Sequence, residues 1–144
     1  MSPLSAADAA SLAPTLDAIR LFLHVAGATV WVGGMFVMMG LQPTARTLGP
    51  EAPKSLARAF SRLAWPAFAL LIITGFWNLA AVNLSDQSNT WQAVFGVKMV
   101  MVILTGVGTF LHQRATTKAG LAIWGSVAGL AAVVALFLGI LIAG

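Results

Sequence analysis

The stretch from Leu21 to Gly40 is almost entirely apolar, and its twenty residues match the length that crosses the hydrocarbon core of a bilayer. It carries one histidine, His24, with Trp31 seven residues further on. An ionisable ring inside a membrane-spanning helix is costly, so it usually has a partner or a function. We therefore interpret the rest of the chain as the walls, partners and anchors of this helix.

The whole chain is poor in charge. Of its 144 residues, 59% are apolar and 8% are charged, whereas soluble domains carry roughly 25% charged residues. A span needs about 20 apolar residues, so this length accommodates four spans with short loops and no soluble domain. The predicted fold is all-α: an integral membrane four-helix antiparallel bundle in contact with the lipid bilayer. The absence of cysteine excludes disulfides and thiolate metal sites.

Prolines, glycines and charges between the apolar runs give the expected helix boundaries. Residues 1–14 are expected to form an exposed N-terminal arm, and residues 15–144 the transmembrane domain. Pro43 is expected to end the first helix, and Pro66 to kink the second. The predicted helices cover residues 15–41, 56–82, 90–113 and 119–142.

The charges outside the apolar runs predict the orientation. The first and third loop regions carry six cations against one anion: Arg46, Lys54, Arg58, Arg62, Arg114 and Lys118 against Glu51. The arm, the second loop and their flanks carry Asp8, Asp17 and Asp86 with Arg20. Because positive loops stay in the cytoplasm, both termini are predicted to be extracytoplasmic. The net charge of +4 is thus a topology signal and does not indicate nucleic-acid binding. The expected location is a bacterial-type inner (plasma) membrane, crossed several times.

Polar side chains from three helices are expected at one depth. His24 and Lys98 each lie about eight residues inside the outer start of their helix, roughly 12 Å at 1.5 Å per residue. Thr74 and Asn78 lie at a comparable depth, and Arg20 lies one turn above His24. The candidate cofactor-binding residues are therefore His24, Lys98, Arg20, Trp31, Asn78 and Thr74.

Helical periodicity places these groups inside the bundle. On the first helix, three- and four-residue steps connect Arg20, His24, Gly27, Trp31, Gly34 and Met38. On the third helix, Trp91, Lys98, Thr105, Thr109 and His112 share a face. The spans hold no carboxylate to pair with Lys98. Three explanations are open: burial keeps its amine uncharged, its side chain extends to the membrane–water interface, or an anionic ligand is its partner. Structural roles are the alternative for His24, as a hydrogen-bonding side chain, and for Trp31, as interior packing.

Three motifs resemble the CopD-like membrane domain. They are His24–Phe36 (HVAGATVWVGGMF), the Thr-Gly step within Ile73–Phe76, and the Gly-x-Lys entry ending at Lys98. Their order and spacing resemble that family from about Leu21 to Arg114. The resemblance implies copper handling or transport across the inner membrane.

A more distant resemblance is to HemJ, a small four-helix protoporphyrinogen oxidase with b-type haem. His24, Trp31 and Lys98 stand at the positions that resemble that family's histidine, tryptophan and lysine. The HemJ segment after the tryptophan contains a tyrosine and an arginine, and Gly34–Met39 contains neither. The resemblance therefore implies haem binding rather than the oxidase reaction.

Three functions are compatible with these patterns: copper handling or transport, which the CopD resemblance puts first, with haem binding and an accessory role as the alternatives. Copper(I) favours thioether and imidazole ligands, which His24, Met35 and Met38 could supply along a path. Haem b could be held in the bundle by His24, with Arg20 and Lys98 near its propionates. A non-enzymatic accessory subunit could dock a membrane partner or a second copy through Gly125 and Gly129 of the last helix. No residue is predicted to be catalytic, and the balance is against an enzyme.

Overall fold

A computed structural model describes residues 14–143, and all of its long elements are helices. Most of the expected N-terminal arm lies outside the described residues. The elements are α1 (Thr15–Ala28), η2 (Thr29–Gly33), α2 (Gly34–Thr47), α3 (Ala52–Ala80), η3 (Leu84–Asp86), α4 (Asn89–Arg114) and α5 (Lys118–Ala143).

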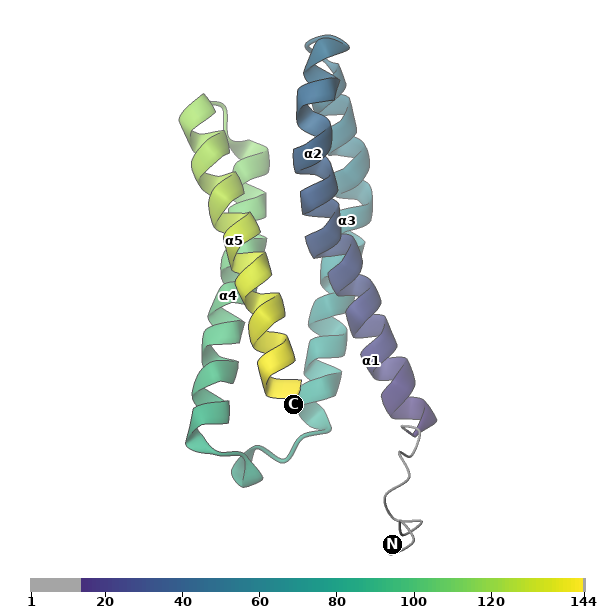
Figure 1. Cartoon of the computed structure of the whole chain (residues 1–144), viewed down its shortest axis with the longest axis vertical. Coiled ribbons are helices and arrows are strands. Elements are labelled where there is room, and N and C mark those ends of the chain that lie inside the picture. Colours follow the sequence, from purple (N-terminus) through teal and green to yellow (C-terminus); the bar gives the residue numbers. More distant parts are fainter. Residues whose placement is uncertain (1–13, 144) are drawn as a thin grey trace, which may run out of the picture.

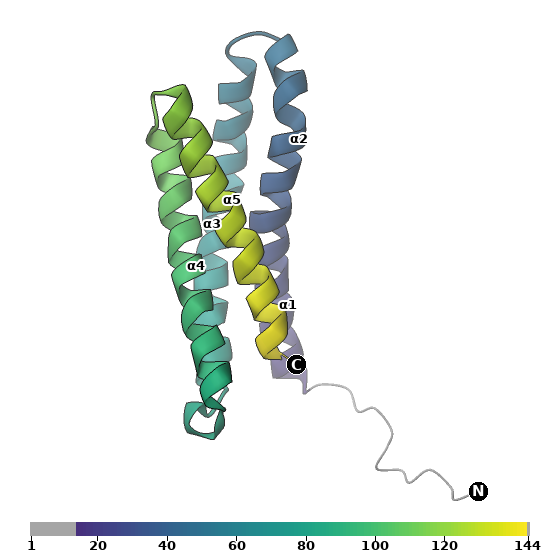
Figure 2. The same ribbon diagram turned by 60° about the vertical axis from the view of Figure 1, so that its left-hand side comes forward.

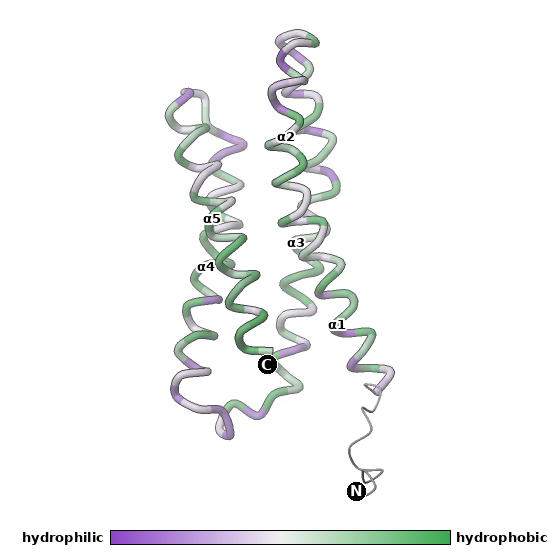
Figure 3. Tube along the Cα trace, viewed as in Figure 1, coloured by the Kyte–Doolittle hydropathy of each residue, from purple (hydrophilic) through white to green (hydrophobic). Residues whose placement is uncertain are grey.

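Four of the described helical segments are long and apolar enough to cross a membrane. The first joins α1, η2 and α2 into 33 residues, and α3, α4 and α5 contain 29, 26 and 26 residues. Figure 3 shows apolar residues along the middle of these helices and polar residues gathered towards their ends. Many large apolar side chains point outwards, among them Phe22, Ile73 and Ile140, each more than 60% exposed. Such a surface suits lipid and identifies a multi-pass membrane protein.

The helices form two pairs. The α1–η2–α2 segment packs along α3, and α4 packs along α5 (Figure 1). Successive long helices run in alternating directions, so α5 ends near the level at which α1 begins (Figures 1 and 2). The two pairs meet through η2, which contacts both α3 and α5.

The first helix runs further than proline reasoning predicted. Pro43 was expected to end it, but α2 continues through Pro43 to Thr47. A proline inside a helix removes one N–H donor, but the next turn can stay helical when packing holds it. Here Ala45, in the turn that follows Pro43, is buried. The chain reverses only at Gly49, whose φ of +122° suits glycine.

The second helix begins four residues earlier than predicted, at Ala52. Pro53 lies in its first turn, where a missing N–H costs nothing because that donor has no partner inside the helix. Pro66 lies within α3, which remains one continuous helix to Ala80. The last two helices match their predicted bounds to within one residue at each end.

A π turn at Thr29–Gly33 interrupts the first span. A π turn adds one residue to a helical turn, and it lets the neighbours Trp31 and Val32 both face the core. The core cluster consists of Trp31, Val32, Ala64 and Ala132, with Met35, Phe60, Trp65, Phe68 and Leu71 packed against it. Elsewhere small residues bring helices close: a Cβ on Gly108 would lie 3.1 Å from the Ala128 backbone.

Candidate functional site

His24 of α1 is hydrogen-bonded to Thr74 of α3. The His24 Nδ1 lies 2.8 Å from the Thr74 hydroxyl, and that hydroxyl donates to the Leu70 carbonyl at 2.7 Å. A hydroxyl has one proton, so the Thr74 oxygen accepts from His24 and the Nδ1 carries the hydrogen. In the neutral ring the Nε2 then bears a free lone pair, and it makes no hydrogen bond within residues 14–143. The His24 ring is therefore oriented as imidazole ligands of metals commonly are.

The Thr-Gly step brings α3 against the His24 ring. Thr74 is buried, with 1% of its surface exposed. A Cβ on Gly75 would lie 3.6 Å from His24 Cε1, which is ordinary contact. One turn deeper, a Cβ on Gly27 would lie 3.1 Å from the Ala67 carbonyl oxygen. Close approach of α1 and α3 therefore sets the position of the ring.

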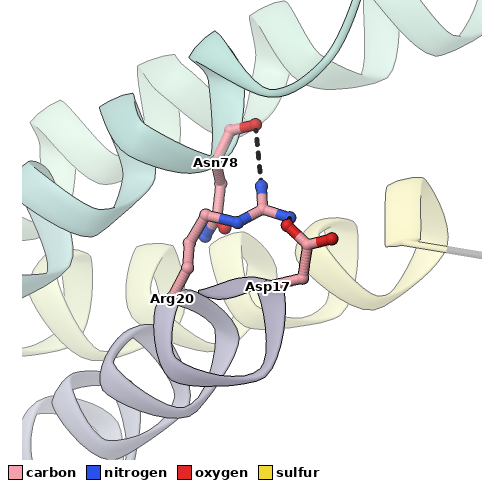
Figure 4. Close-up of polar contacts among 3 residues, drawn as sticks. All are labelled: Asp17, Arg20 and Asn78. Carbon is pink, nitrogen blue, oxygen red and sulfur yellow. Dashed lines mark hydrogen bonds and ion pairs between the residues drawn. The ribbon is translucent and has the colours of Figure 1, made fainter. Parts of the chain in front are cut away.

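Arg20, one turn nearer the start of α1 than His24, links the same two helices, and Figure 4 shows it between Asp17 and Asn78. Its guanidinium pairs with Asp17 at 2.9 Å and donates to the main-chain carbonyl of Asn78 at 3.4 Å. The sequence interpretation assigned Asp17 to the acidic flank, although the three-residue spacing could have revealed this pair. Because Asp17 neutralises Arg20, the charge available to a ligand from this arginine is reduced.

Asn78 takes part through its backbone, whereas the prediction concerned its side chain. The Asn78 Oδ1 is buried and makes no hydrogen bond in the described part of the chain. Its amide oxygen is thus an unused polar atom beside Arg20 near the C-terminal end of α3.

Lys98 of α4 extends towards α5. The ammonium lies 3.3 Å from the place where a Cβ on Gly139 would stand, so this glycine makes room for it. Within residues 14–143, Lys98 has no ion pair and no hydrogen bond. Gly139, in a run of bulky residues, was overlooked by the sequence analysis and adds α5 to this layer.

Trp31 lies in the core instead of the His24 layer. Its Nε1 donates to the Thr105 hydroxyl at 3.2 Å, and Thr105 donates to the Ala128 carbonyl at 2.9 Å. Its ring stacks on Phe68 with centroids 4.3 Å apart. With 1% of its surface exposed, Trp31 has no free face for a cofactor.

The other candidate metal ligands, two methionine sulfurs and a second imidazole, are far from His24. Met35 and Met38 are roughly 16 and 21 Å further along the helix at 1.5 Å per residue, so one ion cannot contact all three. Met35 packs against the core cluster. His112 bonds the Leu121 carbonyl at 2.8 Å near the other end of α4. No group of three or more His, Cys, Asp or Glu side chains converges among the described residues.

The site therefore has three chemical components. His24 supplies one nitrogen lone pair, Lys98 supplies one cation that has no partner among residues 14–143, and Asn78 supplies one amide oxygen unused by those residues. A ligand that combines an imidazole-binding centre with negative charge would use the first two together. Comparisons of the chain with protein-family models, curated proteins and solved structures find no match.

Proposed function

We propose that this chain is an inner-membrane protein that binds b-type haem, or a closely related metalloporphyrin, through His24 Nε2. The proposed arrangement is an antiparallel bundle with both termini extracytoplasmic, which puts the His24 layer in the outer half of the membrane. The observation that carries the proposal is the contact between His24 Nδ1 and the Thr74 hydroxyl: with the hydroxyl proton on the Leu70 carbonyl, Nδ1 carries the hydrogen and Nε2 keeps its lone pair.

The charges near His24 support a porphyrin over a bare metal ion. Haem iron accepts a single histidine as its axial ligand, and its propionates attract cations. Lys98 has no protein partner in the described residues and lies beside Gly139 of α5. A bare copper ion would be repelled by this ammonium, whereas a carboxylate of the porphyrin would pair with it. Because His112 is occupied near the other end of α4, a single protein ligand to the iron is expected.

A bound haem would supply one-electron redox chemistry. The residues of this chain would bind and orient it: His24 as ligand, Thr74 as the acceptor that holds the ring, and Lys98 as the counter-charge. Arg20, paired with Asp17, would contribute less.

The two histidines of the chain provide a matched test. The purified apoprotein in mild detergent is titrated with haemin, and the Soret band is recorded for wild type, His24→Ala and His112→Ala. We expect about one haem per chain for wild type and His112→Ala, and loss of saturable binding for His24→Ala. Equal binding by both variants would show that His24 is not the ligand.

Copper handling is the second candidate. It is favoured by the half-buried Met35 and Met38 on the same helix as His24, which suit successive sites along a path better than one closed site. Competition of the protein with a copper(I) chelator tests it. Binding of one copper(I) per chain, with an affinity that both His24→Ala and Met38→Leu lower, would favour this function if the chain binds no haem.

An accessory subunit is the third candidate. Gly125 already packs against His112, but a Cβ on Gly129 would meet nothing within 4 Å, so only Gly129 leaves α5 open there for a partner or a second copy. Two results together would favour it. The purified chain would hold neither haem nor copper, and a membrane protein would co-purify in stoichiometric amount with wild type but not with Gly129→Leu.

A further inference from the structure

A shallow groove lies between α3 and α4 at the basic end of the bundle, far from His24. Its volume is about 490 Å³, and it is lined by Trp65, Phe110, Gln113 and Arg114. This end carries the cations of the first and third loop regions, and Figure 3 shows polar residues gathered there. None of the lining residues belongs to the site described above.

Internal hydrogen bonds satisfy the polar atoms of the groove wall. Trp65 Nε1 donates to Gln113 Oε1 at 3.2 Å, and Gln113 Nε2 donates to the Ser61 hydroxyl at 3.1 Å. These bonds tie α3 to α4 and leave the Trp65 and Phe110 rings as apolar surface. The wall therefore suits a hydrocarbon chain.

The rim of the groove carries a cation without an anion. The Arg114 guanidinium lies 4.5 Å from the centre of the Phe110 ring, a cation–π contact. The ion pairs within residues 14–143 are Arg20 with Asp17 and Lys54 with Glu51, so Arg114 has no carboxylate partner there. Its N–H donors make no hydrogen bond to any described residue.

We propose that this groove binds one anionic phospholipid of the bilayer, with an acyl chain against Trp65 and Phe110 and the phosphate at Arg114. Basic pockets between membrane helices recognise anionic headgroups in this way. An apolar wall beside a single unpaired cation, at the end of a membrane-spanning helix pair, complements a lipid. A free phosphate would use the rim but not the wall.

Quenching of tryptophan fluorescence tests the proposal: Trp65 is the one of the chain's five tryptophans that lines the groove, so the part of the quenching that Trp65→Phe removes reports on it. The full chain is reconstituted in phosphatidylcholine vesicles that contain phosphatidylglycerol or phosphatidylcholine brominated on the acyl chains. We expect wild type to be quenched at a lower mole fraction of brominated phosphatidylglycerol than of brominated phosphatidylcholine. Arg114→Gln should reduce this preference about fivefold, the effect of one cation at the membrane surface.

Arg46→Gln is the matched control, since it removes an equal charge from the same end but outside the groove. It should keep the preference, and so should wild type with added inorganic phosphate. Phe110→Ala, which opens the wall, is the second variant if Arg114→Gln does not fold. Equal quenching by the two brominated lipids, an equal loss in Arg114→Gln and Arg46→Gln, or displacement of the lipid by phosphate would overturn the proposal.

Discussion

The core around Trp31 and the layer around His24 share one helix and differ in how completely their polar groups are used. In the core, the indole N–H is bonded to Thr105, and Thr105 is bonded to the Ala128 carbonyl. In the layer, His24 keeps a free nitrogen, and Lys98 has no partner among the described residues.

This difference separates stability from binding. A buried polar network with every donor satisfied contributes rigidity and leaves nothing to offer a ligand. A layer with unused donors and acceptors costs stability in the empty protein, and a ligand recovers that cost. Changes in the core should therefore act on unfolding, and changes in the layer on ligand affinity.

The largest expected effect is that of Trp31→Ala. Removing a buried tryptophan should lower the free energy of unfolding by about 3–5 kcal/mol, because it leaves a cavity beside Phe68 and removes the N–H that donates to the Thr105 hydroxyl. Unfolding in mixed detergent micelles with increasing sodium dodecyl sulfate measures it. The control is Trp77→Ala, a residue that is 42% exposed. Equal losses in the two variants would show that the buried contacts of Trp31 add no stability beyond those of an exposed tryptophan.

Thr74→Val should have the next largest effect. It keeps the shape of the side chain but leaves the His24 Nδ1–H without its acceptor, at a cost of about 1–3 kcal/mol in unfolding. Haem affinity should fall about 10- to 100-fold, as for other lost partners of metal-binding imidazoles. Thr109→Val is the control, because the Thr109 hydroxyl is buried without a partner in the described chain and its removal should not destabilise. Unchanged haem affinity in Thr74→Val would contradict the assigned role of its hydroxyl.

Lys98→Met should change stability and haem affinity in opposite directions. Losing a half-buried ammonium without a partner should raise the free energy of unfolding by about 1 kcal/mol, while haem affinity falls. Paired unfolding and haemin titrations measure this. Gly139→Ala should weaken binding without removing the charge, since its Cβ would crowd the ammonium. Destabilisation by Lys98→Met would show that the lysine has a structural role.

The smallest effect is expected at an exposed ion pair outside both regions. Lys54 holds the pKa of the Glu51 carboxyl below its ordinary value of 4.5 through a hydrogen bond and through its charge. A lowered folded-state pKa stabilises the protein above pH 4.5, and this contribution is lost as the pH falls through the lowered value. Since both groups are well exposed, the unfolding midpoint should barely change. Titration by nuclear magnetic resonance should show the pKa rising in Lys54→Met; an unchanged pKa would mean that the pair does not form.

Sequence reasoning predicted the four helices and put His24 and Thr74 at one depth, where a hydrogen bond joins them. The apolar runs predicted four helices, and only the bounds near Pro43 and Pro53 moved by several residues. Depth along each helix singled out His24, Thr74 and Lys98 as neighbours. The missed features were the Asp17–Arg20 pair, the main-chain role of Asn78, the space at Gly139 and the π turn.

The sequence by itself determined the number and length of the apolar helices and the depth of each polar residue, because these depend on the composition of one segment at a time. Only the tertiary structure decided which nitrogen of His24 bears the proton, because that depends on a hydroxyl fifty residues away on another helix. It also decided which group the Trp31 indole bonds, a Thr105 hydroxyl on another helix. Local pattern predicts what a helix contains, and packing decides which of its groups remain free to bind.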